Sequence, residues 1–271
     1  MSVSLTWVDA FTDTPFAGNP AGVCLLEEPL PAATMQSLAT ELGIAETAFV
    51  TPTSAPGTFG LRWFSPLVEI DLCGHATLAS AHVLRAHRVI DGATPVTFDT
   101  RSGALRAAFA GDRIELDFPA VRMADAALPD ALAGEWEAGD VIGAGISSLF
   151  AVVILRSEAA VRRYRPDLAA IAATGHKALL LTAAADPGSA DPGSAADYVL
   201  RVFGPNVGID EDPATGSAQC VVGPYWSAAL GRPALVARQL SPRGAVLYVR
   251  PDGDRVHIGG NAVTVFTGHL C

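Results

Sequence analysis

The chain has 271 residues, which is enough for one large domain or two modest ones, each with its own hydrophobic core. Half of the residues (50%) are hydrophobic and only 17% are charged, as in a compact globular protein. The formal net charge of −10 argues against nucleic acid and anionic membranes as partners, because both would repel the chain. An anionic ligand would therefore need a local positive site, such as the start of a helix.

The four cysteines, Cys24, Cys73, Cys220 and Cys271, lie far apart and form no Cys-x-x-Cys pair. The sequence therefore predicts neither a structural zinc site nor a disulfide framework. The N-terminus carries no basic and apolar leader, and the apolar runs are too short or too interrupted to span a bilayer. We expect a cytoplasmic protein with free thiols.

In the first half of the chain, hydrophobic periodicity predicts two helices among many strands. The helices are expected at 30–42, ending at Gly43, and at 77–88. Strands are expected at 3–9, 16–26 (through a turn at 18–20), 45–50, 61–64, 69–72, 96–98, 105–109 and 114–117. The last three strands follow one another directly, which favours an antiparallel arrangement.

Residues 119–134 have weak periodicity, and we place the domain boundary there. Residues 1–120 are expected to form an N-terminal lobe and residues 121–271 a C-terminal lobe, whose last strand is free to return to the first lobe. In the second lobe we expect helices at 166–174 and 217–230 and strands at 148–155, 178–182, 197–203, 235–239, 245–250, 256–259 and 262–267. The tandem repeat at 185–195 has the composition of a mobile, dispensable surface loop.

The stretch ahead of the helix expected at Ser217 has the composition of a binding site. Asp210, Glu211 and Asp212 come directly before Pro213-Ala214-Thr215-Gly216-Ser217. Thr and Ser are favourable N-cap residues, and the glycine lets another group approach the backbone closely. The first amide groups of a helix carry partial positive charge and lack helical partners, so they bind carboxylates or developing oxyanions. An ordinary solvated loop before a capped helix is the alternative.

A second stretch has the same design, with the strand expected at 69–72 running into Cys73-Gly74-His75 and an Ala/Leu-rich helix. Each half of the chain thus supplies one apolar helix that starts at a glycine. If the two helix starts face each other across a cleft, they form a site for an anion.

Six motifs together resemble the PhzF family, the phenazine-biosynthesis isomerases, which are related in fold to diaminopimelate epimerase. They come in the family's order and span the chain from near its N-terminus to about Trp226. The motifs are Asp9-Ala10-Phe11-Thr12, Phe16-Ala17-Gly18-Asn19-Pro20-Ala21-Gly22-Val23, Glu46-Thr47-Ala48-Phe49-Val50, Arg62-Trp63-Phe64-Ser65-Pro66, Cys73-Gly74-His75-Ala76-Thr77 and Glu211-Asp212-Pro213-Ala214-Thr215-Gly216-Ser217-Ala218.

The resemblance implies an α+β fold of two similar lobes, each a mostly antiparallel β-barrel around a central α-helix, and a homodimer. It also implies a cofactor-independent isomerase that moves a proton on a small carboxylate-bearing substrate, which in phenazine producers is trans-2,3-dihydro-3-hydroxyanthranilate. Neither a nucleotide-binding loop nor a metal cluster is evident in the sequence, since Gly143-Ala144-Gly145 lacks a third spaced glycine. Side chains would therefore perform the chemistry without a metal.

Glu46 occupies the position of the family's acid/base carboxylate and stands among small and apolar residues. His75 and Asp212 would position the substrate and relay protons. The residues expected to bind the substrate are Asn19, Gly74, Thr215, Gly216 and Ser217. Structural roles stay open for Asn19, as a turn residue, and for His75, as a satisfied histidine at a helix start.

Two further functions stay open. In a two-base racemase or epimerase of the diaminopimelate epimerase kind, Cys73 would fill the place of the first cysteine. Pro213-Ala214 fills the second place and Cys220 lies beyond the turn, which weakens this alternative. A non-catalytic binder of small carboxylates would keep the helix ends without turnover, but mere binding needs no acid/base set. A serine hydrolase is set aside because the chain lacks a Gly-x-Ser-x-Gly motif.

Overall fold

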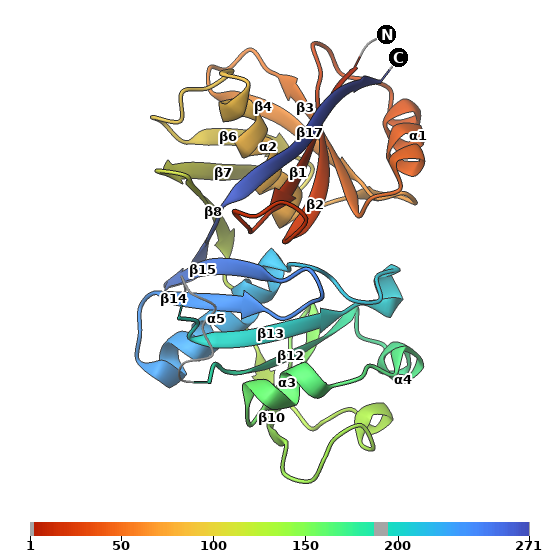
Figure 1. Cartoon of the computed structure of the whole chain (residues 1–271), viewed down its shortest axis with the longest axis vertical. Helices are drawn as coiled ribbons and strands as arrows, with labels where there is room; N and C mark the ends of the chain where they lie inside the picture. The colour runs from red at the N-terminus through yellow and green to blue at the C-terminus, as the bar shows by residue number, and fades with distance from the viewer. Residues whose placement is uncertain (1–2, 187–194, 271) are drawn as a thin grey trace. The chain divides into compact units, whose positions relative to one another are not determined.

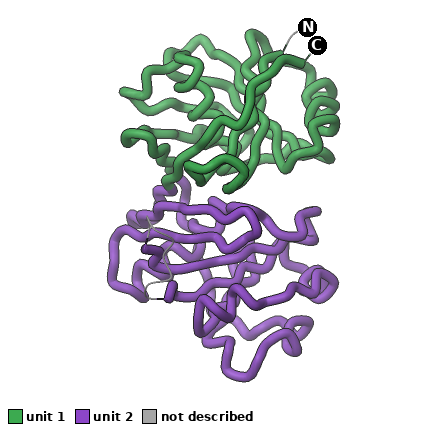
Figure 2. The backbone as a smooth tube through the Cα atoms, viewed as in Figure 1, with its two compact units in different colours: residues 1–117, 259–271 green, residues 118–258 purple. Residues whose placement is uncertain are grey.

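The computed structural model describes residues 3–186 and 195–270. The chain divides into two compact units, unit 1 with residues 1–117 and 259–271 and unit 2 with residues 118–258 (Figure 2). It leaves unit 1 within strand β8 (Arg113–Pro119) and returns within β16 (Arg255–Gly260). Most of the repeat at 185–195 and Cys271 lie outside the described residues, so the prediction of a mobile loop stays a prediction.

Unit 1 is a mixed sheet with two helices, α1 (Ala32–Leu42) and α2 (Gly74–Ala86) (Figure 1). The strands pair in the order β17-β1-β2-β3-β4-β6-β7, and β5 pairs with β4. The pairs β2–β3 and β4–β6 are parallel, and β7 also pairs with β8. The strands are β1 (Val3–Ala10), β2 (Asn19–Leu25), β3 (Glu46–Pro52), β4 (Thr58–Phe64), β5 (Glu69–Ile70), β6 (Val96–Thr100), β7 (Gly103–Ala110) and β17 (Ala262–Leu270).

Unit 2 is also a mixed sheet, paired in the order β9-β10-β11-β12-β13-β14-β15 with β11–β12 and β13–β14 parallel. Its strands are β9 (Ala124–Asp125), β10 (Val141–Ile146), β11 (Phe150–Leu155), β12 (Ala178–Ala184), β13 (Tyr198–Phe203), β14 (Leu235–Gln239) and β15 (Ala245–Asp252). Its helices are α3 (Glu158–Arg163), α4 (Leu168–Ala173) and α5 (Gly216–Leu230), with 3₁₀ turns η1 (Asp130–Leu132) and η2 (Pro205–Val207). The α+β class expected from the sequence is confirmed.

The two units repeat one pattern of pairing. Along β1-β2-β3-β4-β6-β7 the pairs run antiparallel, parallel, antiparallel, parallel, antiparallel. The series β10-β11-β12-β13-β14-β15 follows the same sequence of pairs. In each unit the second parallel connection contains the buried helix, α2 or α5. The starts of α2 and α5 are therefore equivalent places in the two units.

Helix α2 is buried because strands surround it. It contacts β1, β2, β3, β7 and β17, and its four Ala residues and one Ser permit that close approach. The buried hydroxyls of Thr77 and Ser80 donate to the carbonyls of Cys73 and Ala76, at 2.5 and 2.7 Å. Burying these polar groups is therefore compatible with an apolar surrounding, because each has a hydrogen-bond partner.

Several elements differ from the prediction. Helix α2 starts at Gly74 rather than Thr77, so His75 belongs to the helix. Strand β10 was not predicted, because Gly143 and Gly145 interrupt its hydrophobic pattern. Helix α3, which spans six residues after the N-cap residue Ser157, was also not predicted.

The turn before β2 depends on glycine. Gly18 has φ +63°, and an added Cβ would lie 2.2 Å from the carbonyl oxygen of Ala10. Gly43, which ends α1, has the same φ but nothing within 4 Å of its added Cβ. Gly43→Ala is expected to cost about 1 kcal/mol of unfolding free energy through its backbone conformation alone. Gly18→Ala should cost about 3 kcal/mol or more, since the clash is added.

Urea unfolding of the two variants beside the parent chain measures this difference. Equal losses for the two glycines would show that the close approach at Gly18 is unimportant.

Candidate functional site

Glu46 and His75 come together in unit 1. Glu46 is the first residue of β3, and His75 is the second residue of α2. Nε2 of His75 lies 3.0 Å from Oε2 of Glu46, and the two side chains are only 8% and 10% exposed. The carboxylate is therefore largely shielded from solvent. The pair can hold and pass a proton.

Cys73 extends this pair to a row of three. Its Sγ lies 3.5 Å from Nδ1 of His75, so the imidazole bridges a thiol and a carboxylate. Burial raises the pKa of the Cys73 thiol. Burial by itself lowers the pKa of His75, but negative charge on Cys73 and Glu46 and hydrogen bonds to both outweigh it, so the pKa of His75 is raised well above 6.5.

Asn19 lies on the same side of the sheet as Glu46. Ala21 is opposite Glu46 in the parallel β2–β3 pair, and Asn19 is two residues before it in β2. Because side chains alternate along a strand, all three point to the same face. Asn19 is fully buried. Gly18, not Asn19, takes the positive φ of the predicted turn.

The starts of α2 and α5 lack side-chain caps. Cys73 and Thr215 are the N-cap residues, and neither side chain accepts a hydrogen bond from its helix. Thr215 has the predicted N-cap position, but its hydroxyl donates to Oδ2 of Asp212 at 2.6 Å and accepts nothing from the helix; the prediction for Ser217 is wrong, because Ser217 lies inside α5. The helix amides are thus left without a capping side chain, as an anion site requires.

The loop that contains Asp212 is fixed by Gln239, a buried residue of β14 that the sequence does not single out. Its side-chain oxygen accepts from the amide of Thr215 at 2.8 Å. Its nitrogen donates to the Asp212 carbonyl at 2.6 Å and to the Thr215 hydroxyl at 3.1 Å. Ser241 adds a bond to the Pro213 carbonyl at 2.7 Å. Only the folded chain brings Gln239 beside this loop.

Two acidic residues of the loop have different tasks. Glu211 accepts two bonds, at 2.7 and 2.9 Å, from the guanidinium of Arg201 in β13. It therefore anchors the loop to the sheet. Asp212, held by Thr215, remains the acidic candidate of this loop for contact with a ligand.

The predicted residues thus form two groups. Unit 1 contains Glu46, His75, Gly74 and Asn19, with Cys73 as an addition. Unit 2 contains Asp212, Thr215, Gly216 and Ser217. Unit 2 has no carboxylate in the place of Glu46, since its equivalent strand β12 opens on Ala178.

The structure also revises the comparison with two-cysteine enzymes. The N-cap position equivalent to Cys73 in unit 2 is Thr215, not Pro213-Ala214. Cys220 lies within α5, where burial raises the pKa of its thiol to about 12. Neither Thr215 nor Cys220 therefore supplies a second thiolate at the position equivalent to Cys73.

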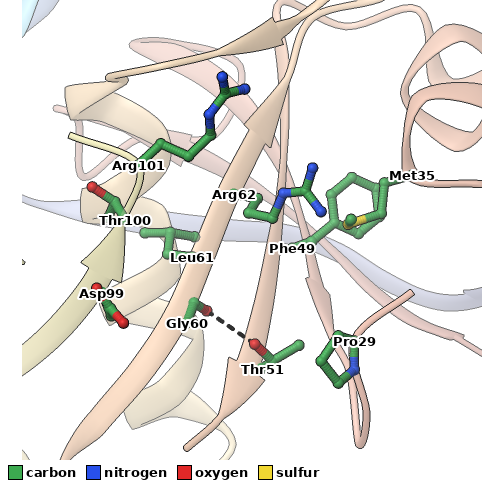
Figure 3. Close-up of a pocket in the computed structure, with 10 residues that line it drawn as sticks. All are labelled: Pro29, Met35, Phe49, Thr51, Gly60, Leu61, Arg62, Asp99, Thr100 and Arg101. Atoms are coloured by element: carbon green, nitrogen blue, oxygen red, sulfur yellow. Dashed lines mark hydrogen bonds between the residues drawn. The ribbon is translucent and has the colours of Figure 1, made fainter. Parts of the chain in front are cut away.

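A separate hollow of about 340 Å³ opens on the other face of unit 1 (Figure 3). Phe49 lines it, and Phe49 is three residues after Glu46 in β3, so the two side chains point to opposite faces. Arg62 and Arg101 lie on its rim, and both pair with Glu69 of β5, at 2.7 and 2.9 Å. None of the predicted site residues lines this hollow.

Two mixed-sheet units, with a buried carboxylate–imidazole pair at the start of a buried helix, define an α+β protein with acid–base side chains at a helix end. The chain belongs to the phenazine biosynthesis-like protein family, whose PhzC-PhzF model matches residues 8–268. In the described part of the chain, no helix combines the length and apolar character needed to cross a membrane.

Relatives and solved structures agree with this membership. An uncharacterised isomerase of Pseudomonas aeruginosa is 42% identical, over 100% of this chain and 99% of its own. A PhzF-family protein of Enterococcus faecalis is 35% identical and superposes with a TM-score of 0.91 over 100% of both chains. A hydroxyproline epimerase of Agrobacterium vitis shares the fold alone, with 14% identity and a TM-score of 0.61 over 99% of this chain and 91% of its own.

Replacing Gln239 should loosen the Asp212 loop. Gln239→Leu leaves the buried amide of Thr215 without its acceptor, so we expect a loss of about 2 to 4 kcal/mol in unfolding free energy. Faster hydrogen exchange of the amides of Asp212, Ala214 and Thr215 should accompany it. Thr182→Val is the control, since it breaks two buried bonds away from this loop, one from Trp226 of α5 and one to the Val199 carbonyl. Unchanged exchange in Gln239→Leu would contradict the anchoring role.

The Glu69 ion pairs predict a dependence on pH. The hydrogen bond from Arg62 is the main cause that holds the pKa of Glu69 below its usual value of 4.5. Because the folded pKa is the lower one, the stabilisation is complete above the unfolded pKa and is lost as the pH falls through the folded value. Glu69→Gln should therefore cost about 0.5 to 1 kcal/mol at neutral pH and nothing in acid.

Urea unfolding of the parent chain and Glu69→Gln, from about pH 7 to about pH 3, measures this loss. Glu28→Gln, at an exposed position, is the control. A difference between parent and variant that persists unchanged in acid would count against the ion pairs as its source.

Proposed function

We propose that this chain is a cofactor-independent isomerase, which moves a proton on a small carboxylate-bearing substrate. The observation that carries the proposal is the buried Glu46–His75 pair, whose Oε2 and Nε2 atoms lie 3.0 Å apart. Burying a carboxylate costs folding free energy unless the carboxylate is paired. A buried carboxylate with a charged partner is therefore a candidate for a functional role. The relatives named as isomerases support the same class of reaction.

In this proposal Glu46 removes a proton from a carbon of the substrate and returns one elsewhere. His75, whose Nε2 lies 3.0 Å from Oε2 of Glu46, positions the carboxylate for both transfers. The amides at the start of α2 accept the substrate carboxylate or an enolate-like oxygen, because they carry partial positive charge. Asn19, on the same face as Glu46, contacts the substrate.

Residues of unit 2 also belong to the proposal. We propose that the two units are similar barrels around central helices. Asp212 would then relay protons, and Thr215, Gly216 and Ser217 would bind the substrate through their hydroxyls and the amides of α5. One candidate substrate is trans-2,3-dihydro-3-hydroxyanthranilate. A cytoplasmic homodimer, without nucleic acid or membrane partners, completes the proposal.

The two alternatives are less well supported. A two-thiol racemase needs a second cysteine at the start of α5, and Thr215 is the N-cap residue there. The hydroxyl of threonine is far too weak an acid to replace a thiolate as a base at neutral pH. A pure binding protein would have no use for a carboxylate that is buried beside an imidazole rather than placed in solvent.

Glu46→Gln tests the proposal. The amide keeps the size of the side chain but cannot accept a proton, so solvent-deuterium incorporation should fall by about 10²- to 10⁴-fold. The assay screens cyclic amino acids and hydroxy acids for enzyme-dependent exchange in heavy water. Glu41→Gln, on the exposed side of α1, should retain full exchange. Full exchange in Glu46→Gln would overturn the assignment of Glu46 as the base.

A further inference from the structure

The row of Glu46, His75 and Cys73 brings three kinds of donor atom together. One carboxylate oxygen, one imidazole nitrogen and one sulfur all lie within 4.8 Å of one another, and all three residues are buried. Thiolate and imidazole are ligands that Zn²⁺ prefers, whereas Mg²⁺ and Ca²⁺ select oxygen. The three donor atoms therefore match Zn²⁺ rather than Mg²⁺ or Ca²⁺.

The distances also fit such an ion. Ligands at the usual Zn–N, Zn–O and Zn–S lengths of about 2.0 to 2.3 Å are separated by about 3.4 to 3.6 Å around a tetrahedral ion. Nε2 of His75 lies 3.0 Å from Oε2 of Glu46 and 3.9 Å from Sγ of Cys73. Shifts of a few tenths of an ångström would bring these two pairs into that range, and the carboxylate oxygen and the sulfur lie within 4.8 Å of each other.

The helix start opposes a cation, because the first amides of α2 carry partial positive charge. A carboxylate and a thiolate together bring two negative charges to the same place, which offsets this effect. The three residues come from a strand start and a helix start that packing already fixes, so the ligands need little reorganisation.

We infer that Glu46, Cys73 and His75 form a three-ligand site for Zn²⁺, with the fourth position open to water or to a substrate oxygen. Binding releases the proton of the Cys73 thiol and that of the His75 imidazolium to solvent. An ion held there occupies the groups assigned to proton transfer, so Zn²⁺ inhibits the enzyme. This last consequence rests on the proposed function, whereas the site itself does not.

Titration with Co²⁺ tests the site directly. The protein is the full chain, free of affinity tags and chelator-treated, with Cys271→Ser as background so that the terminal thiol cannot contribute. A single equivalent of Co²⁺ should produce the near-ultraviolet charge-transfer band of a thiolate–cobalt bond, and Zn²⁺ should abolish it by displacement. Mg²⁺ should do neither, because it avoids sulfur.

Three variants assign the ligands. Cys73→Ser should lose the band, and Glu46→Gln should weaken Co²⁺ binding by at least about tenfold while keeping it. Cys24→Ser, which removes a buried thiol elsewhere in unit 1, should leave the titration unchanged. Circular dichroism of each variant checks that it is folded, and Cys73→Ala replaces Cys73→Ser if the latter does not fold.

A missing band, or a band that survives removal of Cys73, overturns the site. The proposed function fails in a different way. If Glu46 is not the base, Glu46→Gln keeps full deuterium exchange, whether or not the parent chain binds Co²⁺. If exchange depends on Glu46 and no Co²⁺ binds, the isomerase proposal stands and the metal site does not.

Discussion

The structure depends on burying three polar side chains, Glu46, Cys73 and His75, at the start of α2, a helix that is itself buried. Helix α2 is surrounded by strands, so the side chains at its start must either be apolar or have hydrogen-bond partners. His75 meets this requirement with both ring nitrogens, one near the thiol of Cys73 and one near the carboxylate of Glu46. The three side chains therefore depend on one another, and removing one leaves a buried polar group unpaired.

The two units use one plan for different purposes. Their strand pairings follow the same order, and their buried helices start at equivalent places without side-chain caps. Unit 1 adds the carboxylate and the imidazole, whereas unit 2 adds an Asp that is held by a threonine and a buried glutamine. The repeated plan gives each unit a buried helix whose first amides have no capping side chain, and in unit 1 a buried carboxylate and imidazole lie beside that helix start.

Much of this could be predicted from the sequence. Strands, the stop of α1 at Gly43 and the strand–turn–helix units follow from periodicity and glycine placement, because these signals are local. The contacts of Cys73 with His75, and of Gln239 with a loop 24 residues earlier in the chain, could not be predicted. They arise when separate elements pack, and nothing in a strand pattern distinguishes Gln239 from an ordinary buried position.

The path of the chain constrains the order of folding. Unit 2 is one uninterrupted segment, residues 118–258, while unit 1 is assembled from both sides of it. Strand β17 pairs with β1 along its whole length. Strand β1 therefore gains this partner only after the residues of unit 2 have been synthesised. During synthesis on the ribosome, unit 2 can mature while the unit that carries Glu46 still lacks an edge. The sheet that carries the Glu46–His75 pair is therefore completed only after unit 2 has been synthesised.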